Sequence, residues 1–153
     1  MFSQTVEYAL RIMVFLADTP NQSLTTRRIA QATHVPIGYL AKVLQNLVKA
    51  GLVTSQRGFH GGFTLGKNPT TITLLDVVNT VDPICRIARC PLSLPAHHTQ
   101  LCTLHRRLDN AIALVQQALA ISTLAELNLD APYCPPRSDC RNSLQKPPPT
   151  QDP

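Results

Sequence analysis

The stretch from residue 89 to residue 109 concentrates side chains that can bind a metal or carry out redox chemistry. It contains two cysteines and three histidines, namely Cys90, His97, His98, Cys102 and His105. Thiolates are soft anionic ligands that suit iron–sulfur chemistry, and cysteine together with histidine also suits zinc. Because His105 follows Cys102 by three residues, both side chains can face the same side from the first turn of a helix.

These donors leave more than one interpretation open. A zinc-bound structural or protein-interaction module could use the residues named above. The five cysteines could instead be plain thiol sensors, because their odd number and the lack of a visible secretory signal argue against a disulfide framework. No nucleophile–base pair, phosphate loop or paired carboxylates stand out, so the sequence does not favour an enzyme.

The excess positive charge lies in the N-terminal part of the chain. Of the 153 residues, 44% are hydrophobic, which is enough for the core of one domain with an appendage. Residues 1–67 contain seven Lys and Arg against two acidic residues, whereas the remainder contains seven of each. This asymmetry favours a polyanionic partner for the N-terminal part.

No apolar run is long enough to span a membrane, so we expect a cytoplasmic protein with no membrane partner.

Residues 1–82 follow the order of a winged helix-turn-helix domain. Apolar spacing predicts helices over 5–17 and 36–50, with the short helix TRRIAQAT between them. The β-prone runs LVTSQ and FTLG flank the glycine-rich RGFHGG, which predicts a hairpin. Thr73 and Asp76 have the spacing of a capping box for the helix LLDVVNTV. The predicted fold is mainly α with a small β-hairpin, and the second helix of the pair is expected to enter the major groove of double-stranded DNA.

Side chains that can reach DNA occur at three places in this domain. They lie at the start and polar side of the second helix of the pair, at the start of the helix before it, and at the hairpin tip. Basic and polar groups contact phosphates and base edges, and glycines allow close approach of the backbone. The predicted DNA-binding residues are Arg27, Arg28, Ile37, Gly38, Tyr39, Lys42, Gln45, Arg57, His60 and Gly61.

The rest of the chain divides into a loop, a long helix and a tail. Residues 83–98 are irregular and are predicted to be a cysteine-containing cluster or sensor loop. Residues 99–130 are predicted to be a dimerisation helix that begins near Thr99, with a further cap at Thr123 adding its last turns. Its apolar stripe is too long to be buried on the winged domain alone, so pairing with a second copy is expected. The stripe consists of Leu101, Leu104, Leu108, Ile112, Val115 and Leu119.

The proline-rich residues 131–153 are predicted to be a disordered tail. Cys134 and Cys140 lie in it and are expected to be bystanders, because the tail offers no scaffold. His97 and His98 are expected to be exposed in a polar loop.

Three segments of the chain resemble the IscR/NsrR family of winged-helix transcriptional regulators. They are EYALRIMVFLA, VPIGYLAKVLQNLVKAGLVTSQRGFHGGFTLGK and ITLLDVVNTVD, and the resemblance covers about residues 2–130. It implies a homodimer whose long C-terminal helix crosses its partner, and a repressor that binds a promoter palindrome. It also implies sensing of redox, nitric oxide or iron status, because many members carry an iron–sulfur cluster.

The resemblance further implies how such a cluster, of 2Fe-2S or 4Fe-4S type, is held. Cysteines before the long helix bind it, and a residue from the partner's first helix can complete it. This chain offers Cys85, Cys90 and Cys102, but the last gap is long and lacks the middle cysteine that often occurs there. Two ligand sets therefore stay open: the three cysteines with Glu7 of the partner subunit, or two cysteines (Cys90 and Cys102) with Glu7 or His105.

Overall fold

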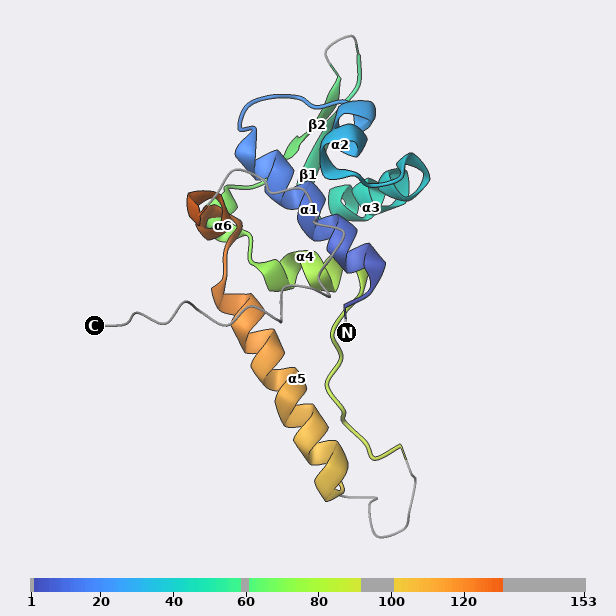
Figure 1. The fold of residues 1–153 in the computed structure, drawn as a ribbon, viewed down its shortest axis with the longest axis vertical. Coiled ribbons are helices and arrows are strands. Elements are labelled where there is room, and N and C mark those ends of the chain that lie inside the picture. The colour runs from blue at the N-terminus through green and yellow to red at the C-terminus, as the bar shows by residue number, and fades with distance from the viewer. Residues whose placement is uncertain (1, 59–60, 92–100, 131–153) are drawn as a thin grey trace, which may run out of the picture.

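A computed structural model describes residues 2–58, 61–91 and 101–130 (Figure 1). It is mainly helical with one two-stranded antiparallel hairpin, which confirms the predicted winged helix-turn-helix fold with a C-terminal helix. The elements are α1 (Gln4–Asp18), α2 (Thr26–Thr33), α3 (Ile37–Lys49), β1 (Val53–Gln56), β2 (Gly62–Leu65), the short 3-10 helix η1 (Pro69–Thr71), α4 (Leu74–Val81), α5 (Thr103–Ile121) and α6 (Leu124–Asp130). None of the helices in the described ranges has the length and apolar character that crossing a bilayer requires.

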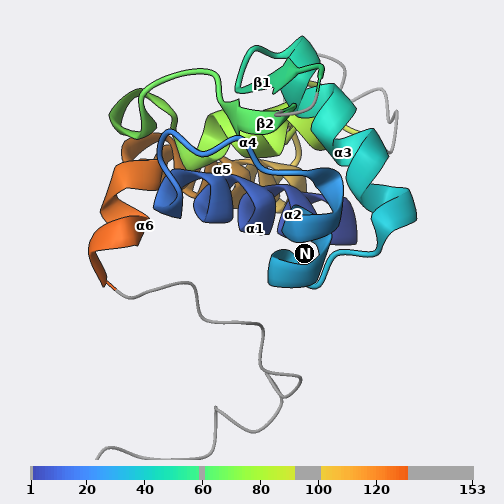
Figure 2. The same ribbon diagram turned by 90° about the horizontal axis from the view of Figure 1, so that it is seen from above.

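Helix α1 is the centre of the core and contacts α2, α3, α4, α6 and strand β2 (Figure 2). The Ser3 hydroxyl caps its start by accepting a hydrogen bond from the Val6 amide at 3.4 Å. Apolar side chains on about half of its circumference are buried, which lets one helix hold several others. The buried residues are Val6, Tyr8, Ala9, Ile12, Met13, Leu16 and Ala17.

Helices α2 and α3 form the predicted helix-turn-helix. Helix α2 begins after Thr25, whose hydroxyl accepts the Arg28 amide at 3.3 Å, and ends at His34, which has a left-handed φ of 54°. Pro36 precedes α3, where a missing amide hydrogen costs nothing because the first amides of a helix have no partner. The predicted apolar face of α3 is buried, which leaves the opposite face for a ligand. That apolar face consists of Leu40, Val43, Leu44 and Leu47.

The hairpin of β1 and β2 forms the wing, with Gln56 opposite Gly62 at its outer end. The wing is attached to the loop before α2, because the amides of Leu24 and Phe63 each donate to the other's carbonyl, at 3.0 and 2.9 Å. Gly62 is required at this contact, since a Cβ there would lie 2.7 Å from the Leu24 carbonyl oxygen. The hairpin is therefore held against the helix-turn-helix by its own backbone.

Helix α4 begins and ends as the sequence predicts. In its capping box the Asp76 amide donates to the Thr73 hydroxyl at 3.1 Å, and the Thr73 amide donates to the Asp76 carboxylate at 3.0 Å. Pro83 follows the last turn and cannot continue the helix. The chain leaves as the irregular segment 83–91.

The C-terminal helices differ from the prediction at their start. Helix α5 begins at Thr103, four residues later than predicted, because Cys102 is its N-cap and the Cys102 Sγ accepts the amide of His105 at 3.5 Å. The predicted turns after Thr123 form α6. Leu124 is fully buried in the core, and backbone hydrogen bonds of 2.9 and 3.0 Å join its surroundings to the start of α4. Helix α6 therefore packs on the winged domain.

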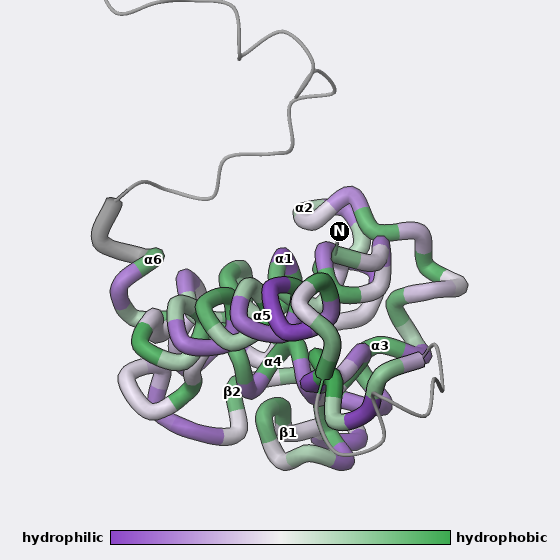
Figure 3. The backbone as a smooth tube through the Cα atoms, turned by 90° about the horizontal axis from the view of Figure 1, so that it is seen from below, coloured by the Kyte–Doolittle hydropathy of each residue, from purple (hydrophilic) through white to green (hydrophobic). Residues whose placement is uncertain are grey.

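Helix α5 projects away from the winged domain, with the segment that follows α4 on one side of it (Figure 1). None of its residues is buried in this chain, and Leu108 and Val115 are 48% and 41% exposed. Figure 3 shows hydrophobic and hydrophilic stretches alternating along its turns. Much of the apolar surface of α5 thus has no cover from the described part of its own chain.

Candidate functional site

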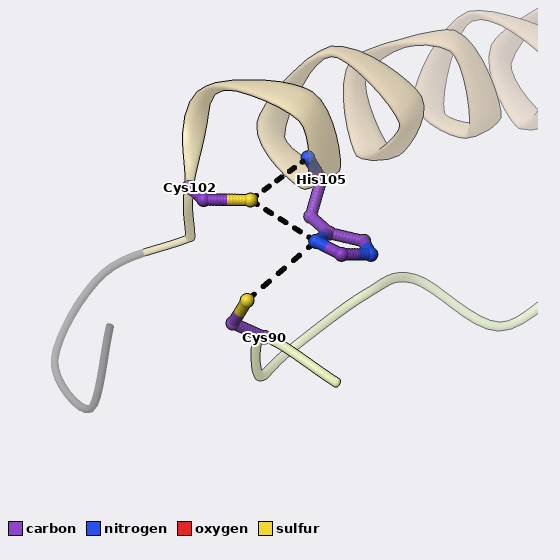
Figure 4. Close-up of side chains that lie close together, drawn as sticks. All are labelled: Cys90, Cys102 and His105. Atoms are coloured by element: carbon purple, nitrogen blue, oxygen red, sulfur yellow. Dashed lines mark hydrogen bonds between the residues drawn. The ribbon is translucent and has the colours of Figure 1, made fainter. Parts of the chain in front are cut away.

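Three of the predicted ligands meet at the free end of α5. The ligand atoms of Cys90, Cys102 and His105 all lie within 4.8 Å of one another. The Nδ1 of His105 is 3.1 Å from the Sγ of Cys102 and 3.5 Å from the Sγ of Cys90 (Figure 4). Two of these residues belong to the start of α5, and the third comes from the end of segment 83–91. The fold therefore brings two separate parts of the chain to one site.

The site is partly shielded and favours an ionised thiol. The Cys90 side chain is buried, and Cys102 and His105 are half-buried. The backbone amide of His105 and, with a smaller effect, its ring form hydrogen bonds with the Sγ of Cys102. These bonds lower the pKa of the Cys102 thiol to about 7. Thiolate is the form that binds metals, so Cys102 is prepared for a metal near neutral pH.

Alkylation of the metal-free protein should reveal this thiolate. Reaction of Cys102 with iodoacetamide, followed by peptide mass spectrometry, should increase with pH through a midpoint near pH 7, because only the thiolate reacts. His105→Ala removes the ring that stabilises the thiolate, so its midpoint should move to higher pH. A wild-type midpoint close to the ordinary value of 9.0 would contradict the hydrogen bonding described above.

The other predicted ligands lie apart from this group. Cys85 is exposed, and its Sγ lies 3.7 Å from the carbonyl oxygen of Pro83. Glu7 is exposed on α1, where its Oε1 accepts hydrogen bonds from Arg11 at 2.9 and 2.8 Å. A role for Glu7 in a partner's site stays a prediction. The predictions for His97, His98, Cys134, Cys140 and the tail lie outside the described residues.

The three donors that do meet fit an iron–sulfur cluster in kind. Two sulfurs and one imidazole nitrogen are a mixed ligand set that such clusters accept. The same set suits zinc, which binds four ligands in structural sites. Either centre would need at least one more ligand than the described residues place here.

The predicted DNA-binding residues belong to α2, α3 and the hairpin, which lie at the other end of the molecule from the free end of α5 (Figure 1). The apolar side chains of Ile37 and Tyr39, in the first turn of α3, are 60% and 57% exposed. Gly61 is half-buried, and a Cβ there would lie 2.6 Å from the Gln56 carbonyl oxygen. The hairpin itself therefore requires a glycine at this position. His60 lies outside the described residues. The other predicted residues are exposed: Arg27, Arg28, Gly38, Lys42, Gln45 and Arg57.

Tyr39 contacts helix α1 through a residue to which sequence reasoning assigned no role. The ring of Tyr8 on α1 is buried and meets the Tyr39 ring edge to face, with centroids 6.0 Å apart. The guanidinium of Arg11 lies 5.9 Å from the centre of the Tyr8 ring. Only the aromatic character of Tyr8 within an aliphatic helix face could have indicated this contact.

An apolar groove lies where the start of α1, the residues after α4 and the middle of α5 come together. Its volume is about 560 Å³. Part of the predicted dimerisation stripe therefore faces an open groove. The lining residues are Phe2, Ser3, Val6, Asp82, Pro83, Ile84, Ile87, Leu108, Ala111, Ile112 and Val115.

Comparison with known proteins identifies the family. Residues 2–130 match the Rrf2 family, described as iron-dependent transcriptional regulators. Over 131 residues the chain is 30% identical to a protein of Aquifex aeolicus that carries the name HTH-type transcriptional regulator, covering 83% of this chain and 90% of that protein.

Solved structures agree with this match. CymR (YrzC), the global cysteine regulator of B. subtilis, superposes with a TM-score of 0.72 at 28% identity, covering 86% of this chain and 98% of that one. IscR of T. potens gives a TM-score of 0.72 at 22% identity, covering 86% and 88%. The matches confirm the winged-helix fold and exclude an enzyme, since the family consists of regulators. The chain belongs to the Rrf2 family of DNA-binding, winged-helix transcriptional regulators.

Proposed function

We propose that this Rrf2-family regulator senses redox, nitric oxide or iron status through an iron–sulfur cluster bound by Cys90, Cys102 and His105. The observation that carries the proposal is the meeting of these three ligand atoms within 4.8 Å at the free end of α5. The description of the family as iron-dependent supports the choice of metal.

Within this site, Cys90 and Cys102 supply anionic sulfur and His105 supplies nitrogen. Glu7 of the partner subunit or Cys85 completes the ligand set. When bound, a cluster of 2Fe-2S or 4Fe-4S type supplies reversible one-electron chemistry, whose potential depends on the ligands and their hydrogen bonds.

The two parts of the chain that form the site, segment 83–91 and helix α5, both connect to the DNA-binding domain. Cys90 ends the segment that leaves α4, and Cys102 begins α5, whose last residues are hydrogen-bonded to the start of α4 through Leu74 and Ser122 at 2.9 Å. Loss of the cluster removes the link between Cys90 and the start of α5, although the contacts of α5 with residues 84–87 remain, and lets α5 change its angle to the winged domain. We infer that this movement changes DNA affinity, and that the regulator acts in the cytoplasm as a repressor.

The exposed surface of α5 supports a homodimer. This 19-residue helix has no buried residue, and a helix with so much apolar surface requires a partner. A second copy that packs along α5 and into the 560 Å³ groove would cover it. In such a dimer, the two α3 helices enter successive major grooves of a near-palindromic site. The large exposed apolar side chains of α5 are Leu104, Leu108, Leu114, Val115 and Ile121.

The exposed start of α3 provides the base contacts in this proposal. Ile37 and Tyr39 present apolar surface to bases, and Lys42 and Gln45 reach phosphates and base edges from the next turns. The exposed basic residues of α2 and the wing contact the DNA backbone on either side.

Gly38→Ala should stabilise the protein and weaken its DNA binding. A Cβ at Gly38 meets nothing within 4 Å, so the substitution should stabilise α3 by about 0.5–1 kcal/mol. If the backbone there approaches DNA closely, the added methyl group should lower affinity by about tenfold. Thermal unfolding and DNA titration measure the two effects. Unchanged affinity in the stabilised variant would remove Gly38 from the interface.

The test of the sensing proposal is anaerobic purification with a visible spectrum and counts of iron and sulfide, followed by DNA titrations of loaded and metal-free protein. Iron and sulfide in equal amounts, with a different DNA affinity after their removal, are expected. Zinc without sulfide would favour the zinc-bound alternative. Metal-free protein whose DNA affinity responds to thiol oxidation would favour the thiol sensor.

A further inference from the structure

One carboxylate on α5 holds the segment that carries Cys90. The Oδ1 of Asp109 accepts hydrogen bonds from the Nε of Arg86 at 2.6 Å and from the amide of Ile87 at 2.9 Å, and its Oδ2 accepts one from the Nη2 of Arg86. The Asp109 side chain is only 13% exposed, while Arg86 covers it from the solvent side and is 48% exposed. Hydrogen bonding from Arg86 holds the pKa of Asp109 below its ordinary value, so the carboxylate stays ionised.

The position of this contact determines where Cys90 lies. Asp109 follows His105 by four residues, so it lies one turn further along the same face of α5. Ile87 precedes Cys90 by three residues in a segment that has no regular secondary structure. A second contact, from Gln116 Nε2 to the carbonyl of Ile84 at 2.8 Å, holds the same segment two turns further on.

We propose that Asp109 is a positioning residue: with Arg86 and the Ile87 amide it clamps segment 83–91 against α5 so that the Cys90 thiol stays beside Cys102. The inference deepens the proposed function, and its metal part rests on that proposal. Donors held in place before a metal arrives bind it more tightly than donors that must first be ordered. Removal of such outer contacts typically lowers metal affinity by about 10- to 100-fold.

The clamp can be tested in metal-free protein by measuring how readily the thiols of Cys90 and Cys102 form a disulfide. In the full chain with its three other cysteines replaced by alanine, the effective concentration of Cys90 and Cys102 is measured in glutathione redox buffers. Disulfide formation oxidises the two thiols and reduces one oxidised glutathione to two reduced molecules. Asp109→Ala should lower the effective concentration by about tenfold or more, since it removes all the charged hydrogen bonds of the clamp.

Further variants separate the contacts of the clamp. Asp109→Asn keeps an acceptor for the Ile87 amide but lacks the charge that Arg86 binds, so it should give an intermediate value. Arg86→Ala leaves α5 unaltered and should also lower the effective concentration, which keeps the test decisive if Asp109 variants fold poorly. Arg107→Ala and Gln117→Ala remove exposed side chains of the same helix and serve as controls.

Two outcomes would overturn the clamp: wild-type effective concentrations in both Asp109→Ala and Arg86→Ala, or an equal fall in the two control variants. In anaerobically purified protein with all cysteines present, Asp109→Ala should lose iron to a chelator about tenfold faster than wild type. If wild type itself holds no iron, the proposed cluster is wrong, and the glutathione measurement still decides the role of Asp109.

Discussion

Cys102→Ala is expected to abolish iron binding by the anaerobically purified protein. The substitution removes a thiolate that lies 3.1 Å from the Nδ1 of His105. It also removes the N-cap that accepts the His105 amide and holds the first turn of α5. Because one ligand is lost and a second is released, iron and visible absorption should fall by more than about tenfold.

Two further variants show which of these losses matters. Cys102→Ser restores an N-cap but not a thiolate, so it should recover the stability of α5 and still lack iron. Cys90→Ala should also lose iron, while Cys134→Ala, in the predicted tail, should keep it. Full iron content in both Cys90→Ala and Cys102→Ala would show that the cluster lies elsewhere.

Replacement of Leu108 and Val115 together by glutamate is expected to convert the proposed homodimer into monomers. The two residues lie seven positions apart on one face of α5 and are 48% and 41% exposed in the single chain. Two glutamates should therefore leave the monomer folded, but in the dimer they would be buried without a partner charge. That burial costs several kcal/mol, enough to separate the subunits at micromolar concentration.

Sedimentation velocity measures this effect, and circular dichroism verifies that the variant is folded. Asn110→Glu with Gln117→Glu places the same two charges at exposed polar positions of the same helix and should remain dimeric. The monomeric variant should also lose tight binding to a palindromic DNA site, while it retains weak binding to a single half-site. A variant that sediments as the wild-type dimer would place the interface on another face.

The local features of this protein were predictable because their signals lie within one or two helical turns. The capping box of Thr73 and Asp76 and the buried face of α3 both follow from neighbouring residues. The pairing of Cys102 with His105 follows for the same reason, since three residues separate them on one helix. The start of α5 was placed too early because a cysteine is an unusual N-cap.

The composition of the metal site was only partly predictable. The sequence offered Cys85, Cys90, Cys102, Glu7 and His105 as ligands and left two sets open. The structure brings Cys90, rather than Cys85, to Cys102 and His105, because the clamp at Asp109 determines the path of an otherwise irregular segment. No periodic pattern in a sequence records such a contact.

The helices and the hairpin of the winged domain, their order and the faces that they bury follow from the sequence, since caps, turns and apolar periodicity act over a few residues. The tertiary structure alone decided which distant residues meet. Arg86 and Asp109 are 23 positions apart, Tyr8 lies against Tyr39 across two helices, and Leu124 returns to the core from beyond α5. Such contacts depend on how all the elements pack together, because a helix can satisfy its local pattern and still turn its polar residues toward any of several neighbours.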